Sequence, residues 1–220
     1  MTMTLDDAEA AFRAFVLDAR FPCLAGKGVV NTHGHTLGIF GELGSRRSAR
    51  RLARALHRFL DAERGAAPSM RAYVAVFDAT PACDELEFEK RLWEQLERLD
   101  ASQDSGQPWA SGVSDDPADP TFSFSFAGQA LFVIGLHPNS SRIARRFAWP
   151  ALVFNAHEQF DQLRSGNQFE RLRSQVRVRE MALQGSLNPN LADFGERSEA
   201  RQYSGRHTEE TWQCPFHRRP

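Results

Sequence analysis

The stretch TFSFSFAGQALFVIGL, at residues 121–136, constrains the fold of this chain more than any other. Its first half alternates phenylalanine with serine or threonine, which is typical of a strand that buries one face. Its second half, after a turn at Gly128, is apolar on both faces, as expected of a central strand. The two halves predict a β-hairpin, and a hairpin requires antiparallel pairing in the sheet.

Helical and extended patterns alternate along the rest of the chain, marked by apolar residues at helical spacing and by short apolar runs. We expect helices at 5–17, 46–63, 84–101 and 140–149, one or two more within 157–185, and strands at 35–41, 72–79 and 150–155. Ser45 is the expected N-cap of the helix at 46–63. With the hairpin, these elements predict one α+β (mixed α/β) domain over residues 1–220, with about five strands in a mixed sheet and helices packed on it.

Two regions lack this periodicity. Residues 102–120 are rich in turn residues, so we expect a mobile loop there that closes over a site. Residues 185–220 form the second region, and their specific-looking polar sequence predicts an irregular, packed tail rather than disorder.

Composition narrows the class of protein. The chain is 41% hydrophobic and 25% charged, which is ordinary for a soluble globular protein, and its net charge of −1 argues against bulk nucleic-acid binding. No apolar run is long enough to cross a bilayer, and the first residues lack the pattern of a signal peptide. Three cysteines cannot pair without leaving one over, which suits a reducing compartment. We therefore expect a cytoplasmic protein with neither a nucleic acid nor a membrane as its partner.

Four histidines are candidates for chemistry. His137 and His157 each follow a buried strand and precede a predicted helix, where open sheets present ligand-binding groups and free backbone N–H groups favour anions. We expect the two strand ends to line one cavity, although each histidine also suits a structural role at a strand end. His33 and His35 lie two residues apart, so a two-histidine metal site is geometrically possible, but the spacing supplies no third ligand.

Cys23 lies behind Pro22 and ahead of Gly26 and Gly28. A glycine turn would aim backbone N–H groups at the sulfur, lower the pKa of the thiol and stabilise a thiolate. A free cysteine is also a common small core residue, so the residues alone leave both roles open.

Six arginines crowd one side of the predicted helix at 46–63, at positions 46, 47, 50, 51, 54 and 58. Such a row of charges is either a solvated face or a surface that contacts an acidic partner.

Several stretches, taken in order, resemble the YqcI/YcgG family: FPCLAGKG, FSFSFAGQALFVIGLHPNSSRIARRF, PALVFNAHEQFDQLR, LQGSLNPNLADFGERSEARQYSGR and WQCPF. The resemblance runs over residues 21–216. Characterised relatives include haem-dependent N-hydroxylases that act on guanidine groups. The resemblance implies a haem b monooxygenase that hydroxylates a guanidino or amine nitrogen of a small molecule, with electrons from a reductase or from peroxide. A non-catalytic haem-binding, ligand-binding or sensing protein is the alternative.

The resemblance also implies what the site must contain. Haem needs an axial ligand, an apolar slot and cations for two propionates. Thiolate donation promotes O–O cleavage, which favours Cys23 as the ligand, whereas position favours His137 or His157. The hairpin phenylalanines would form the slot.

Two further sets of residues are expected under this resemblance. Propionates would be held by cations and neutral donors among Asn139, Ser140, Ser141, Arg142, Arg145 and Arg146. A guanidinium substrate needs a carboxylate for a bidentate contact, and the candidates are Glu158, Glu196 and Glu199.

Overall fold

The computed structural model describes residues 3–63, 70–103, 107–159 and 169–218. Five strands form one sheet in the order β1-β2-β5-β4-β3. Their bounds are β1 His35–Ile39, β2 Ala72–Val76, β3 Phe124–Phe126, β4 Gln129–Leu136 and β5 Ala151–Ala156. Strands β1 and β2 are parallel, and the other neighbouring pairs are antiparallel. The predicted mixed five-stranded sheet is confirmed, and the predicted hairpin is the β3–β4 pair at one edge of it.

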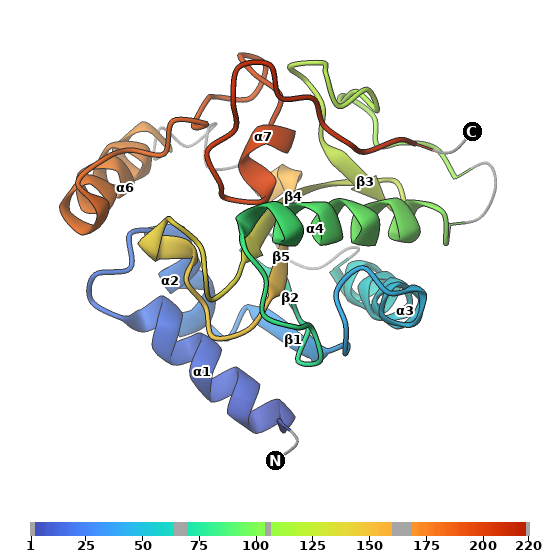
Figure 1. Ribbon diagram of the computed structural model, residues 1–220, viewed down its shortest axis with the longest axis horizontal. Helices are drawn as coiled ribbons and strands as arrows, with labels where there is room; N and C mark the ends of the chain where they lie inside the picture. Colours follow the sequence, from blue (N-terminus) through green and yellow to red (C-terminus); the bar gives the residue numbers. More distant parts are fainter. Residues whose placement is uncertain (1–2, 64–69, 104–106, 160–168, 219–220) are drawn as a thin grey trace.

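Helices cover both faces of the sheet (Figure 1). Helices α1 (Leu5–Leu17) and α2 (Leu24–Asn31) lie on one face of the sheet, and α6 (Phe169–Gln184) packs against α2. Helices α3 (Arg46–Glu63) and α4 (Glu85–Asp100) lie on the other face, where α7 (Ala200–Tyr203) packs on β4. Strand β2 shows why two layers are needed, because Tyr73 and Ala75 enter one hydrophobic cluster while Val74 and Val76 enter the other. Among the described residues, no helix combines the length and the apolar composition needed to cross a membrane.

Local chemistry explains where several elements begin. The Ser45 hydroxyl accepts the backbone N–H of Ser48 at 3.1 Å, so Ser45 caps the start of α3 as predicted. The glycine turn expected after Cys23 is instead the first turn of α2, with Cys23 at its N-cap. The helix expected at 140–149 is only a 3₁₀ turn, η1 (Ile143–Arg145), because the carbonyl of Arg145 turns back to accept the N–H of His137 at 3.0 Å.

The expectation that the first hairpin strand buries one face only is wrong. Ser123 and Ser125 are as buried as the phenylalanines between them. Residues 107–120 cover the strand on both faces: on the serine side the backbone N–H of Ala110 donates to the hydroxyl of Ser125 at 2.9 Å, and on the phenylalanine side the ring of Trp109 packs edge-on against Phe124. Of the segment predicted to be a mobile loop, residues 104–106 lie outside the described part of the chain. The mobility of the rest stays a prediction.

The C-terminal segment folds back over α4. Arg206 and Ser204 both bond the buried carboxylate of Glu89 in α4, at 2.8 and 2.9 Å. Phe216, near the end of the described chain, is buried among the aromatic side chains of the core. These contacts hold residues 191–202 in place beside the sheet, where they form one wall of the cavity described next.

Candidate functional site

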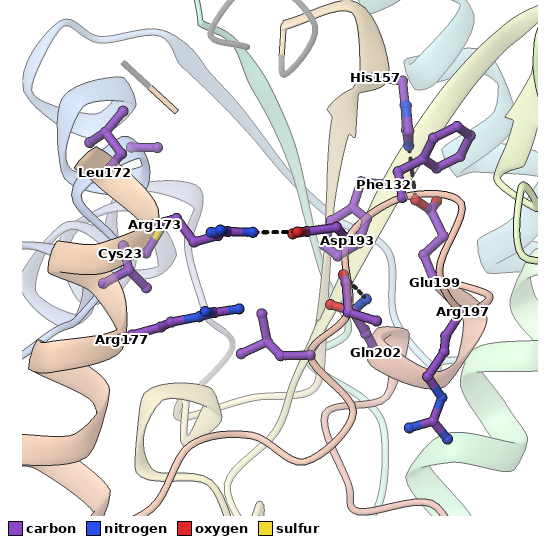
Figure 2. A pocket seen from close by; sticks show the side chains of 15 residues that line it. Cys23, Phe132, His157, Leu172, Arg173, Arg177, Asp193, Arg197, Glu199 and Gln202 are labelled. Atoms are coloured by element: carbon purple, nitrogen blue, oxygen red, sulfur yellow. Dashed lines mark hydrogen bonds and ion pairs between the residues drawn. The ribbon is translucent and has the colours of Figure 1, made fainter. Parts of the chain in front are cut away.

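A mostly apolar cavity of about 260 Å³ lies between α2, α6 and residues 191–202. Its apolar walls come from Ala25, Phe132, Leu172, Val176, Leu191, Ala192 and Phe194. Figure 2 shows Cys23 on the side of α2 and α6, and His157 with Glu199 on the opposite side. The cavity therefore brings together three of the residues that the sequence singles out, and they come from three separate parts of the chain.

Cys23 enters the cavity wall as the N-cap of α2. Its sulfur accepts the backbone N–H of Gly26 at 3.3 Å. Burial raises the pKa of the Cys23 thiol, and the N–H groups of Gly26 and Ala25 only partly oppose that shift. The prediction of a lowered pKa is therefore wrong for the protein without a ligand, because loss of water outweighs the helix N-terminus.

His157 lies in a chain of buried hydrogen bonds. Its Nε2 is 2.8 Å from one carboxylate oxygen of Glu199, and the hydroxyl of Tyr203 donates to the other at 2.5 Å. Burial and the neighbouring Glu199 carboxylate raise the pKa of Tyr203 well above its usual value, so Tyr203 stays a proton donor. Glu199 thus holds the ring of His157 at the cavity surface, which is a positioning role.

His137 lies at the other end of the sheet. Because β4 and β5 are antiparallel, Leu136 pairs with Ala151, whereas the residue before His157, Ala156, pairs with Leu131. The prediction that the two strand ends line one cavity is therefore wrong. His137 is fully buried, stacks on Phe88 with ring centroids 4.3 Å apart, and neither ring nitrogen has a hydrogen-bond partner among the described residues.

The three arginines expected to meet haem propionates are structural instead. Arg142 forms a buried ion pair of 2.5 Å with Glu180 of α6. Arg145 donates to the carbonyls of Gly135 and Gln202 at 3.0 and 3.2 Å, and burial lowers its pKa to about 10.

The third arginine and its neighbours are also occupied. Arg146 donates to the carbonyl of Ser140 at 2.6 Å. Asn139 donates to the carbonyl of Cys83 at 2.9 Å, and the backbone N–H of Ser141 donates to Glu85 at 2.8 Å. Residues 139–146 do not line the cavity. This segment ties the end of β4 to its neighbours, because backbone at a strand end needs partners for its polar groups.

The three carboxylate candidates separate. Glu199 is buried in the cavity wall, with both oxygens occupied as described above. Glu196 accepts the backbone N–H of Asp193 at 3.1 Å and does not line the cavity. Glu158 lines an adjacent hollow that shares His157 and Phe194 with the cavity.

Two basic residues that line the cavity are not among the candidates expected from the sequence. Arg173 and Arg177, one helical turn apart on α6, both extend into the cavity (Figure 2). Arg173 forms ion pairs with Asp193, across the cavity, and with Glu170. No ion pair or hydrogen bond joins Arg177 to any other described residue. An Arg-x-x-x-Arg spacing within the helix predicted at 157–185 was the available signal.

The paired histidines do not form a metal site. His35 turns inward, with Nε2 2.6 Å from a carboxylate oxygen of Glu9, whereas His33 is exposed at a backbone φ of 54°. Across the described ranges, no three His, Cys, Asp or Glu side chains gather closely enough to hold a metal ion. Haem iron does not require three protein ligands, since one protein ligand holds it in many haem proteins.

The arginine row of α3 is exposed on the face of the sheet away from α1 and α2. Within the described residues, no carboxylate forms an ion pair with any arginine of the row. Arg51 instead donates to the carbonyl of Ile39 at 3.1 Å. An acidic partner for this row stays a prediction.

Comparison with known proteins yields one match. The model of the YqcI/YcgG family matches residues 12–217, which is nearly the whole chain. No curated protein and no solved structure matches the chain.

Proposed function

This chain belongs to the YqcI/YcgG family, and we propose that it is a haem-dependent N-oxygenase that hydroxylates a guanidino or amine nitrogen of a small molecule. The observation that carries the proposal is one cavity with apolar walls, a cysteine sulfur and two arginines on one helix face. As part of the proposal we place the reaction in the cytoplasm, where three unpaired cysteines stay reduced. A reductase or peroxide supplies the electrons.

The donor set suits haem b. Cys23 offers sulfur from an N-cap position, where the positive end of α2 stabilises the anion that ligation requires. A metal ion deprotonates a coordinating thiol outright, which overcomes the raised pKa of Cys23. Arg173 and Arg177 take the place of the arginines expected at 142–146 as partners for propionates.

His157 is the alternative ligand, since it lines the same cavity. Its Nε2 is engaged by Glu199 at 2.8 Å, an arrangement that commonly orients a ligating histidine. Between the two ligands we favour Cys23, because electron donation from a thiolate promotes the O–O cleavage that N-oxygenation requires.

The size of the cavity sets a condition on this proposal. Its volume of about 260 Å³ is below the range of about 300–1,000 Å³ that is typical of small-molecule pockets. The ion pair between Arg173 and Asp193 also crosses it. A group as large as haem therefore requires α6 and residues 191–197 to move apart, and Arg173 to exchange Asp193 for a propionate.

Bound haem with a thiolate ligand supplies the activation of dioxygen or peroxide that N-oxygenation needs. The residues of the chain shape the environment of the reacting atoms. Phe132, Leu172 and Val176 exclude water from the reacting atoms. The hydrogen bonds of Glu199 with Tyr203 and with His157 hold the His157 ring in place at the cavity wall.

Absorption spectra test the proposal directly. Purified protein supplemented with haem is expected to develop a Soret band, and the position of its ferrous–CO band distinguishes thiolate from imidazole ligation. Cys23→Ser is expected to lose the thiolate signature, while Cys83→Ser, outside the cavity, keeps it. A wild-type spectrum in Cys23→Ser would rule out thiolate ligation by Cys23. The absence of any Soret band in the wild-type protein would rule out haem binding.

Turnover is tested separately, with arginine, other guanidines and amines in the presence of a reductant and oxygen, or peroxide. Mass spectrometry is expected to show a product heavier by one oxygen atom. A haem-loaded protein that gives no such product across the panel would favour the non-catalytic binding function.

A further inference from the structure

A second hollow, of about 180 Å³, adjoins the apolar cavity. Residues 110–113 and 128–130 make up most of its lining, and we call it the polar pocket. The two hollows share His157 and Phe194, whose rings meet edge-on with centroids 4.9 Å apart. These two rings therefore stand at the boundary between the polar pocket and the cavity proposed to hold haem.

The polar pocket has the charge of a cation site. Among its described lining residues Glu158 is the one that carries a carboxylate, and none is a lysine or arginine. No described residue forms an ion pair or a hydrogen bond with the Glu158 side chain. A carboxylate that lines a hollow and has no cationic partner among the described residues attracts a cationic ligand, and guanidinium pairs with a carboxylate through two parallel hydrogen bonds.

The backbone beside Glu158 is held in place. The side chain of Gln159 accepts the N–H of Arg71 at 2.8 Å and donates to the carbonyl of Arg71 at 2.9 Å. On the other side, His157 is fixed by Glu199. Glu158 thus lies between two anchored residues at the end of β5, which restricts where its carboxylate can reach.

The other two carboxylates are less suited to this role. Glu199 already accepts from Tyr203 and contacts His157, so a ligand would have to displace a buried partner. Glu196 does not line either hollow. Glu158 is therefore the carboxylate that meets a ligand without breaking an internal hydrogen bond.

We propose that the polar pocket binds the cationic head of a small guanidine or amine, with Glu158 as its anchor. This inference rests on the proposed function, because it places the nitrogen to be oxidised beside His157, at the boundary with the haem cavity. The pocket volume of about 180 Å³ suits a head group of a few heavy atoms rather than a large ring system.

Calorimetry of the full chain, as purified and after haem supplementation, tests the inference. Arginine, agmatine and putrescine are the cationic probes, and citrulline is the isostere of arginine in which an uncharged ureido group replaces the guanidinium. At least one of the three cations is expected to bind. If arginine binds, it is expected to bind more tightly than citrulline. Glu158→Gln is expected to weaken that binding about tenfold or more, as loss of a charged hydrogen bond does. The matched control Glu196→Gln is expected to bind as wild type does.

Several outcomes overturn the inference: no cation binds in either form, citrulline binds as tightly as arginine, or Glu158→Gln binds as tightly as wild type. Glu158 is exposed, so the glutamine variant is expected to keep the wild-type circular dichroism. The Soret band reports on haem independently. Glu158-dependent binding of a cation without any Soret band would keep the polar pocket and reject the N-oxygenase, and the reverse pattern would reject the polar pocket alone.

Discussion

Burial disfavours the charged form of two side chains, Cys23 and His137, with different consequences. For Cys23 the raised pKa keeps a neutral thiol in the wall of a cavity, where a metal ion can replace the proton. For His137 burial lowers the pKa, and the ring stacks on Phe88 outside the cavity that Cys23 lines, so the histidine packs there as a neutral aromatic group. Cys23 is thus available for ligation and His137 is not.

His137 should make the protein sensitive to mild acid. Its pKa is lowered in the folded state, so below the unfolded value of about 6.5 the unfolded chain binds a proton that the folded protein resists. Stability therefore falls as pH decreases through that range, by at most about 1.4 kcal/mol per pH unit. Urea unfolding from pH 7.5 to 5 measures the slope.

The control for this prediction is His207→Gln, an exposed histidine of the C-terminal segment. His137→Phe is expected to flatten the acid limb, since a phenyl ring stacks on Phe88 without taking up a proton. Glu85 and Arg145 are the charged groups that act most on His137, in opposite directions. An unchanged slope in His137→Phe would assign the acid sensitivity to another group.

At the scale of elements, α6 is a helix held by ion pairs more than by a buried face. Its hydrophobic contribution to the cavity is modest, and Val178 and Met181 are exposed. Arg142 bonds Glu180 toward the C-terminal end of α6, and Arg173 bonds Asp193 from near its start. Such an attachment suits a helix that must move for a large ligand to enter.

Arg142→Gln should loosen α6. The substitution leaves the carboxylate of Glu180, about 8% exposed, without its cationic partner, and breaking a buried pair costs about 3–5 kcal/mol. Hydrogen exchange measured by mass spectrometry is expected to rise in residues 169–184 before it rises in β2. Arg20→Gln, whose pair with Asp18 is exposed, is the control and should change little. Uniform acceleration over the whole chain would mean that Arg142 supports global stability instead.

The sequence predicts elements better than it predicts their neighbours. Helical spacing places α1, α3 and α4 within a residue or so, because local periodicity reports directly on a buried face. It does not report strand direction, so His137 and His157 look equivalent until β4 and β5 are seen to be antiparallel. Local periodicity also does not reveal the ion pair of Arg142, because its partner Glu180 lies 38 residues away.

The cavity residues show the same difference between local patterns, which can be recognised in the sequence, and contacts between distant segments, which cannot. Cys23 and His157 are found from local patterns, since a cysteine after a proline and a histidine at a strand end are recognisable in the sequence, whereas Glu199 enters only as a carboxylate candidate under the family resemblance. Arg173 and Arg177 are missed because an arginine at helical spacing is usually a solvated residue. Only the packing of α6 against α2 places these two arginines in the same cavity as Cys23.

At the scale of the whole molecule, the cavity depends on contacts made far from it. Residues 191–202 form one wall, and the chain just beyond is fixed to α4, on the outer side of the molecule, by Glu89. Glu89 accepts from Ser204, Arg206 and Trp212, all at 3.4 Å or less. The buried carboxylate of α4 thus holds the segment that closes the cavity.

Glu89→Gln should therefore weaken both the fold and the cavity. The amide keeps the shape but removes the charge beside the buried Arg206, and breaking a buried ion pair costs about 3–5 kcal/mol. Haem affinity, measured by Soret titration, is expected to fall although Glu89 does not line the cavity. Glu87→Gln is the matched control two residues away, since Glu87 pairs with Arg91 near the surface and such pairs contribute little. If Glu89→Gln lost stability in urea but bound haem as tightly as wild type, the wall at 191–202 would hold its position without this anchor.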